Sequence, residues 1–354
     1  MAGRRFLVTG GAGFIGSHVV EALLARGDCV VALDNVSTGS LANLEAIDGH
    51  PAFRFVQGSV LDELIVDELV NDCDVVIHLA AAVGVKLIVD QPLRSLVTNL
   101  RGTEVVIEAA RRYQRKILLA STSEIYGKNG GGALHESSDR ILGSPTVARW
   151  AYSTAKAVDE MLAHAYHKER GLPTVVVRLF NTVGPRQSPA YGMVIPRLVR
   201  QALAGEALTV YGTGTQTRCF CHVDDVVAAL IALLDHPGAV GEVFNVGSTQ
   251  EISIGLLAQR IVELTGSASA IVLVPYDEAY EVGFEDMDRR LPSIDKIRAL
   301  LGWEPQHDLD SILSDTIVDA IRVHDRQQGT DASARSGGQG SAVRSAGSYE
   351  MGGT

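Results

Sequence analysis

The stretch Thr9-Gly10-Gly11-Ala12-Gly13-Phe14-Ile15-Gly16 decides the fold of this chain. An apolar run, Arg5–Thr9, precedes it and predicts a buried strand, and a helical pattern over Ser17–Arg26 follows it. Gly10, Gly13 and Gly16 permit a tight turn and a close approach of the backbone to a bound pyrophosphate. The unpaired N–H groups at the start of a helix attract such an anion. Strand, glycine turn and helix together predict a dinucleotide-binding site.

An acidic residue supports this prediction. A second strand is predicted over Cys29–Leu33, and Asp34 follows it directly, eighteen residues after Gly16. A carboxylate at this place accepts hydrogen bonds from a ribose diol and repels a 2′-phosphate. The sequence therefore favours NAD over NADP.

Strands and helices alternate along the first half of the chain. Further strands are predicted over Phe53–Gln57, Asp74–Leu79, Lys116–Ala120 and Val175–Leu179, and helices over Leu93–Arg112 and Tyr152–Arg170. Nearly continuous apolar strands separated by helices indicate a parallel sheet that is covered on both faces. We expect an α/β fold, a Rossmann-type doubly wound parallel sheet, over residues 1–180.

The alternation breaks after Asn181. Residues 181–325 predict a smaller C-terminal substrate-binding domain, interleaved with the first because a helix over Asp224–Leu234 and a strand over Val243–Val246 return to the main sheet, within about residues 218–247. From 327 to 354 the chain is rich in Gly, Ser and Ala without periodicity, which predicts a disordered tail.

Composition limits the partners. The net charge of −11 argues against nucleic acid, which requires a basic face. The longest apolar stretch, Val226–Leu234, is too short to cross a bilayer, and the apolar run after Met1 is too short for a signal peptide. The four cysteines show no paired metal-ligand spacing, so we expect reduced thiols in a cytoplasmic protein.

A catalytic pattern follows in the segment Tyr152-Ser153-Thr154-Ala155-Lys156. Tyr152 and Lys156 lie four residues apart on a predicted helix and therefore share one face. A nearby ammonium group stabilises a phenolate, which can then remove a hydroxyl proton while hydride leaves the same carbon for a nicotinamide. Thr122, after the strand at Lys116–Ala120, supplies a hydroxyl partner.

These motifs resemble the extended short-chain dehydrogenases that act on nucleotide sugars, the NAD-dependent epimerase/dehydratase family. The resemblance covers about residues 4–325 and includes His78-Leu79-Ala80-Ala81 and the segment from Arg178 to Arg186. It implies bound NAD, a UDP-sugar between two domains, and a homodimer formed through a four-helix bundle. The cofactor-binding residues implied are Gly10, Gly13, Phe14, Ile15, Gly16, Asp34, Asn35, Ser59, Val60, Leu79, Ala80, Ala81, Asn99, Tyr152 and Lys156.

The reaction is indicated by Thr122-Ser123-Glu124. The 4,6-dehydratases of this family carry Thr-Asp-Glu, whereas Thr-Ser-Glu resembles the UDP-glucuronate decarboxylases. The resemblance implies catalytic roles for Thr122, Glu124, Tyr152, Lys156 and Arg290. It implies substrate contacts for Ser123, Arg149, Asn181, Arg218 and Phe284.

Departures from the decarboxylase pattern leave alternatives open. Ile88 and Phe284 stand where tyrosines contact the sugar, and Thr209 replaces a lysine. A UDP-sugar 4-epimerase is therefore a second hypothesis, and an NAD-sensing scaffold without turnover is a third. No metal is expected, because His18, His78 and His222 lack ligand spacing.

Overall fold

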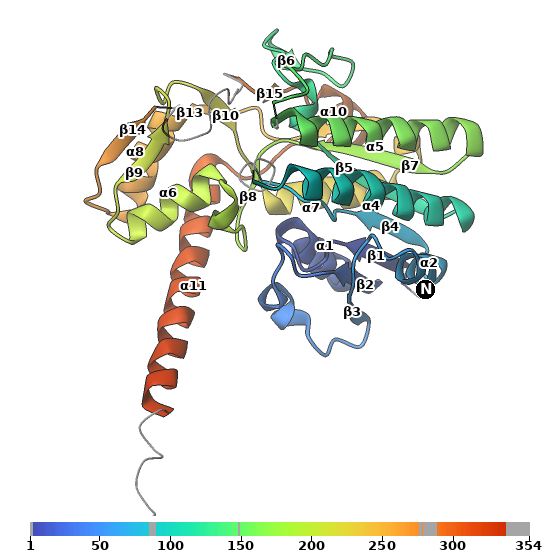
Figure 1. Ribbon diagram of the computed structural model, residues 1–354, viewed down its shortest axis with the longest axis horizontal. Coiled ribbons are helices and arrows are strands. Elements are labelled where there is room, and N and C mark those ends of the chain that lie inside the picture. Colours follow the sequence, from blue (N-terminus) through green and yellow to red (C-terminus); the bar gives the residue numbers. More distant parts are fainter. Residues whose placement is uncertain (1–2, 85–89, 148, 276–277, 279–288, 338–354) are drawn as a thin grey trace, which may run out of the picture.

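A seven-stranded parallel sheet forms the centre of the molecule (Figure 1). The structure is a computed structural model, and it describes residues 3–84, 90–147, 149–275, 278 and 289–337. In spatial order the strands are β12 (Val243–Val246), β7 (Thr174–Leu179), β5 (Lys116–Thr122), β4 (Val75–His78), β1 (Arg5–Thr9), β2 (Cys29–Asp34) and β3 (Phe53–Gln57). The predicted Rossmann-type sheet is thereby confirmed, including the return of β12 to it.

Helices cover both faces of this sheet. One face packs against α1 (Phe14–Ala25), α7 (Val223–Asp235) and α10 (Asp295–Leu301), the other against α2 (Glu63–Asn71), α4 (Pro92–Arg112) and α5 (Arg149–Arg170). Side chains alternate along each strand, so Phe6 and Val8 of β1 enter the first core and Leu7 enters the second. Both faces are buried, which explains why the strands are almost uniformly apolar.

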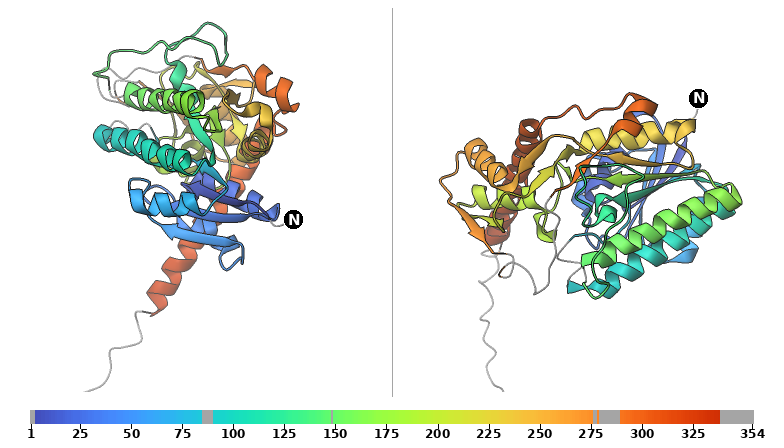
Figure 2. Two further views of the ribbon diagram at one scale, coloured as in Figure 1. Left: turned by 90° about the vertical axis from the view of Figure 1, so that its right-hand side faces the viewer. Right: turned by 90° about the horizontal axis from the view of Figure 1, so that it is seen from above.

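A second lobe has its own apolar core (Figure 2). It contains α6 (Val194–Leu203), β9 (Leu208–Tyr211), α8 (Ile254–Thr265), β14 (Ile271–Val274) and α11 (Leu309–Gly337). Short ladders pair β8 (Thr182–Val183) with β11 (Cys221–His222), β10 (Thr217–Cys219) with β13 (Glu251–Ser253), and β6 (Ala133–Leu134) with β15 (Leu291–Pro292). Short 3-10 helices are η1 (Leu41–Ile47), η2 (Ser123–Tyr126), η3 (Pro189–Tyr191) and η4 (Pro237–Ala239).

The structure differs from the prediction at some boundaries. Helix α1 begins at Phe14, inside the glycine stretch, because Gly13 serves as its N-cap. Helix α11 runs to Gly337, past residue 327, where a disordered tail was expected, and residues 338–354 lie outside the described residues. The division into domains at residue 180 stays a prediction.

The position of the site follows from the order of the strands in the sheet. It reverses between β1 and β4, since the chain proceeds to β2 and β3 on one side and to β5, β7 and β12 on the other. The crevice outside the carboxyl ends of the strands at such a reversal is where open α/β sheets bind ligands. Thr9, Asp34, His78, Thr122 and Leu179 end their strands at this edge.

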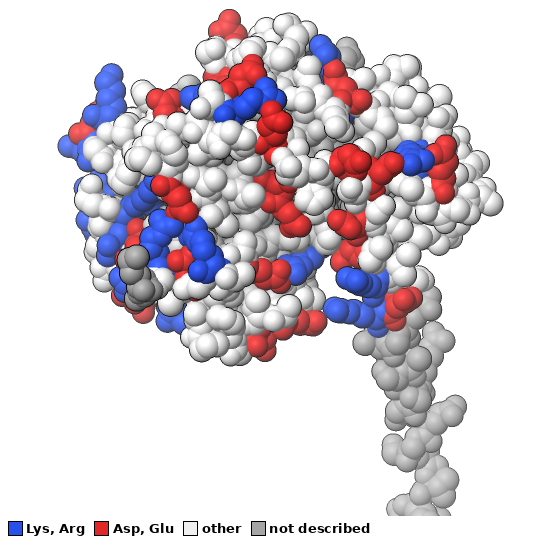
Figure 3. Space-filling view, turned by 180° about the vertical axis from the view of Figure 1, so that it is seen from behind, with Lys and Arg blue, Asp and Glu red and all other residues white. Residues whose placement is uncertain are grey.

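Charged side chains of both signs are mixed on the face shown in Figure 3. Ion pairs among the described residues include Arg26 with Asp235 and Arg260 with Asp310. Within the described residues, no helix combines the length and apolar character needed to span a membrane.

Candidate active site

A cavity of about 780 Å³ lies at the carboxyl ends of the strands. It is lined by most of the residues predicted for the site: Gly10, Gly13, Phe14, Ile15, Gly16, Asp34, Asn35, Ser59, Val60, Leu79, Ala80, Ala81, Thr122, Ser123, Glu124, Tyr152, Lys156, Asn181 and Arg290. The fold thus brings together residues that lie far apart in the sequence, from Gly10 after β1 to Arg290 before β15.

The glycine turn forms one end of this cavity. Gly10 has φ +73°, and a Cβ on it would lie 2.8 Å from the backbone nitrogen of Ala80. Gly13 is the N-cap of α1 and has no side chain to occupy the helix start. The first N–H groups of α1 are therefore accessible to an anion. A side chain at Gly10 would collide with the Ala80 backbone, so glycine is required for this turn beside the start of α1.

Asp34 closes the same end. Its Oδ2 accepts a hydrogen bond from the Ala12 amide at 3.0 Å, and its Oδ1 accepts one from the Val36 amide at 2.8 Å. These bonds fix the carboxylate beside the glycine turn. Burial raises the pKa of Asp34, and the backbone amides oppose that shift.

Tyr152 and Lys156 lie on the first turns of α5, and Thr122 ends β5. Tyr152 is buried, and this burial, with the charges of Glu124 and Asp159, raises its pKa above the ordinary value for tyrosine. A hydrogen bond with the Thr122 side chain opposes the shift. Ionisation of this phenol near neutral pH therefore requires a nearby cation that stabilises the phenolate. Lys156 lines the same cavity.

Glu124 and Arg290 form an ion pair inside the cavity. Arg290 Nη1 lies 3.6 Å from Glu124 Oε1, and the side chains are 7% and 15% exposed. Glu124 belongs to η2, whereas Arg290 directly precedes β15. The β15–β6 ladder fixes Arg290 there, since the amide of Ser293 also donates to Leu134 O at 2.9 Å. A cation and an anion are thus held side by side next to Tyr152.

Other predicted residues lie elsewhere. Asn99 is buried behind the cavity wall, where its side chain exchanges two hydrogen bonds with the backbone of Ala82. Arg218 is buried in β10, with Nη1 donating to Thr217 O at 2.8 Å, and it does not line the cavity. The Arg149 side chain and all of Phe284 lie outside the described residues. The roles of these four residues stay predictions.

Arg186 and Gln187 line the cavity but were not predicted for the site. Arg186 has φ +70°, its Nη2 donates to Glu21 of α1 at 2.7 Å, and its amide donates to Asp319 of α11 at 2.7 Å. It therefore joins the glycine-turn helix to the second lobe. The adjoining Gly184-Pro185 turn, placed after a buried strand, was the sequence signal that could have found it.

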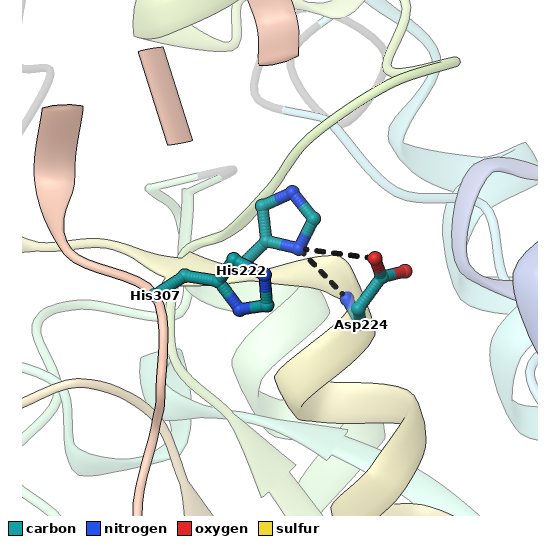
Figure 4. A group of neighbouring side chains, drawn as sticks. All are labelled: His222, Asp224 and His307. Atoms are coloured by element: carbon teal, nitrogen blue, oxygen red, sulfur yellow. Dashed lines mark hydrogen bonds and ion pairs between the residues drawn. The ribbon is translucent and has the colours of Figure 1, made fainter. Parts of the chain in front are cut away.

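A histidine cluster lies apart from this cavity, at the start of α7 (Figure 4). Potential ligand atoms of His222, Asp224 and His307 lie within 4.8 Å of one another. However, His222 Nδ1 already accepts the Asp224 amide at 3.1 Å, and the two imidazoles stack with centroids 4.2 Å apart, so their in-plane lone pairs do not converge. The positive end of the α7 dipole also opposes a cation. We interpret the cluster as a helix cap.

Comparison with known proteins agrees with the geometry of the site. The family model for GDP-mannose 4,6 dehydratase matches residues 7–316. The chain belongs to this family. The resemblance to NAD-dependent epimerases and dehydratases inferred from the motifs is thereby confirmed.

Relatives within the family differ in reaction. The chain is 42% identical over 315 residues to the UDP-N-acetyl-alpha-D-glucosaminuronate decarboxylase of Bacillus cytotoxicus, covering 89% of this chain and 97% of the relative. It is 38% identical to the UDP-glucuronic acid decarboxylase 1 of Xenopus tropicalis, covering 89% and 71%. The solved UDP-glucuronic acid 4-epimerase of Bacillus cereus, in complex with UDP-glucuronic acid and NAD, matches with a TM-score of 0.81 and 30% identity, covering 90% and 99%.

Proposed function

We propose that this protein is an NAD-dependent decarboxylase of UDP-linked uronic acids. The observation that carries the proposal is the Glu124–Arg290 ion pair in the cavity that also contains Tyr152 and Lys156. A dehydratase needs an acid at position 123 to protonate its leaving group, and this chain has Ser123 there. The named decarboxylases among its relatives, at 42% and 38% identity, support the same reaction.

The residues at the glycine turn fit NAD. Gly10, Gly13 and the start of α1 would hold the pyrophosphate, and Asp34 would accept hydrogen bonds from the adenosine ribose. When bound, NAD supplies the hydride acceptor. Tyr152 and Lys156 lie on the wall of the same cavity, where a sugar hydroxyl can meet both groups.

The first step is removal of the proton from the C4 hydroxyl of the sugar. Tyr152 takes this proton through its phenolic oxygen, since Lys156 stabilises the phenolate and Thr122 hydrogen-bonds to the same side chain. The C4 carbon becomes a ketone as its hydride leaves. The carboxylate at C6 is then a β-keto acid.

The second step is loss of carbon dioxide. The bond between C5 and the carboxylate breaks, and its electron pair moves toward the C4 carbonyl to form an enolate. A buried guanidinium stabilises this negative charge, and Arg290 is held 3.6 Å from Glu124 for that purpose. Glu124 fixes the position of the Arg290 guanidinium inside the cavity.

Incubation of the protein with NAD and UDP-glucuronate, and separately with UDP-N-acetylglucosaminuronate, tests the proposal. Mass spectrometry that shows loss of one CO₂ supports a decarboxylase and identifies which uronate is preferred. The relative at 42% identity favours the N-acetylated sugar as a second candidate substrate. An unchanged mass with inversion at C4 by NMR would replace the proposal with a 4-epimerase, and no NAD-dependent change in any UDP-sugar would favour a sensing scaffold.

Asp34→Ala tests the cofactor site. We expect the Kd for NAD to rise by about tenfold, because a hydrogen bond to a charged group contributes about 1.5–3 kcal/mol, and the preference for NAD over NADP to decrease. Isothermal titration with both dinucleotides measures this. Asp62→Asn is the control: Asp62 caps α2 through the Leu64 amide, and asparagine caps equally well. Unchanged NAD affinity in Asp34→Ala contradicts the assignment.

We also propose that the protein forms a homodimer through α4 and α5. These helices pack side by side on the outside of the molecule (Figures 1 and 2), and they expose Leu93, Val158 and Met161. Met161 is 62% exposed. An unpartnered apolar stripe on two adjacent helices fits a four-helix interface.

Met161→Glu tests this interface. A buried unpaired carboxylate is unfavourable, so we expect the dimer to dissociate at least about 100-fold more readily, as measured by light scattering after size exclusion. Leu256→Glu is the matched control, since Leu256 is 58% exposed on α8 in the second lobe. A monomeric unmodified protein, or equal dissociation in both variants, contradicts the interface.

A further inference from the structure

Asp159 is a buried carboxylate that the mechanism above does not use. It lies on α5 three residues after Lys156, and Lys156 Nζ donates to its Oδ2 at 3.2 Å. Both side chains are 4% exposed. Removal of two charges from water is unfavourable unless the geometry is good, so a pair this close to a reaction centre needs an explanation beyond stability.

We propose that Asp159 is a positioning residue for Lys156, holding its ammonium group beside Tyr152 and sharing its charge with the phenolic oxygen. The proposal deepens the proposed function and rests on it, since Lys156 has its role only if Tyr152 removes a proton. In this role Asp159 also sets the pH range over which Tyr152 removes that proton.

The other charged groups that the structure describes around the pair have partners of their own or are neutral. On α5, Glu160 binds Arg178 of β7 through Oε2 at 2.7 Å. On η2, Glu124 is paired with Arg290. On β4, burial and the Lys156 charge lower the pKa of His78 to about 3, so His78 is neutral at physiological pH. Asp159 is therefore the carboxylate that faces Lys156 directly.

The effect of Asp159 on the pKa of Tyr152 has a definite direction. Its charge is one of the causes that raise the pKa of Tyr152, after burial and Glu124. Burial raises the pKa of Asp159, and the Lys156 charge together with hydrogen bonds from Lys156 and from Thr103 of α4 opposes that shift. Without the Asp159 charge, the Lys156 ammonium group stabilises the Tyr152 phenolate more strongly, so Tyr152 ionises at lower pH. It also frees the Lys156 side chain to move, which slows the reaction once Tyr152 is ionised.

Asp159→Asn separates these effects. The measurement is the pH dependence of nicotinamide reduction in a single turnover of the NAD-loaded protein with a UDP-uronate. We expect the midpoint of the rising limb to fall by about one pH unit, from the loss of one nearby charge at an effective dielectric constant of about 20. We expect the plateau rate to fall about fivefold through looser positioning of Lys156, with KM and NAD content unchanged.

Two further variants keep the test decisive. Asp159→Glu retains the charge, so its midpoint should return toward that of the unmodified protein even if the plateau stays low. Asp67→Asn is the matched control, because Asp67 accepts from Tyr113 OH at 2.7 Å and joins α2 to α4 outside the cavity. Its midpoint should not move. A midpoint in Asp159→Asn that is unchanged or higher overturns the proposal.

Failure of the proposed function is distinguishable from failure of this inference. If no UDP-sugar reduces the bound NAD, the decarboxylase and epimerase hypotheses both fail. The tyrosinate absorbance of the NAD-loaded protein, taken as a difference against Tyr152→Phe, then reports the ionisation of Tyr152 without any substrate. Ionisation at lower pH in Asp159→Asn still supports the coupling, and identical titrations overturn it.

Discussion

Tyr152→Phe is expected to reduce turnover by about 10³-fold, within the range that a positioned general base contributes, while NAD stays bound. The substitution removes only the phenolic oxygen, and the ring remains buried at the start of α5. Single-turnover nicotinamide absorbance measures the loss, and NAD content after gel filtration measures retention. Because the pKa of Tyr152 is raised, the activity of the unmodified protein should increase with pH across the neutral range.

Tyr126→Phe is unsuitable as a control for this variant, because the Tyr126 hydroxyl donates to Asn245 Oδ1 at 2.6 Å within the core. Tyr113→Phe is the better control, since Tyr113 lies at the end of α4, outside the cavity. It should retain full turnover. Full activity in Tyr152→Phe would show that another group removes the proton.

Arg290→Ala is expected to retain oxidation at C4 but to slow CO₂ release by about 10²–10³-fold, the effect of removing one group that stabilises a developing negative charge. Reduced nicotinamide and a 4-keto uronate should accumulate on the protein, because the β-keto acid forms without the cation that stabilises its enolate. Quench-flow mass spectrometry with nicotinamide absorbance follows both steps in one experiment.

Arg289→Ala provides a matched control one residue away. Arg289 is 43% exposed and pairs with Glu251 of β13, so its loss should leave both steps unchanged. Arg290→Lys restores a positive charge and guards against a folding defect. Normal CO₂ release from Arg290→Ala would contradict the role assigned to the ion pair.

Local features of the sequence predicted much of the first lobe. Strands β1, β3 and β12 have the bounds predicted for them, because apolar runs between turn residues mark buried strands. The turn from Gly10 to Gly16 and the acid at Asp34 are read from neighbours along the chain. Helix α2 was not predicted, although Asp62 caps it and Val66, Leu69 and Val70 form its buried face.

Contacts between distant segments could not be predicted in this way. Asp159 shares a helix with Lys156, yet its pairing depends on how deeply α4 and β4 bury that face of α5. Asn99, predicted near the cofactor, binds the backbone of Ala82, a residue that lines the cavity, and this contact depends on how α4 packs beside the end of β4. Burial is a property of the assembled layers, and a single segment does not specify it.

By itself the sequence determined the Rossmann-type sheet, the dinucleotide turn and the spacing of Tyr152 and Lys156, since each depends on residues close together on one element. Only the tertiary structure decided that Arg290 meets Glu124, that Arg186 joins the two lobes and that Asp159 faces Lys156 where both side chains are buried. The physical reason is the range of the interactions: periodicity specifies which face of a helix or strand is apolar, whereas electrostatics in the cavity depend on which faces the chain brings together.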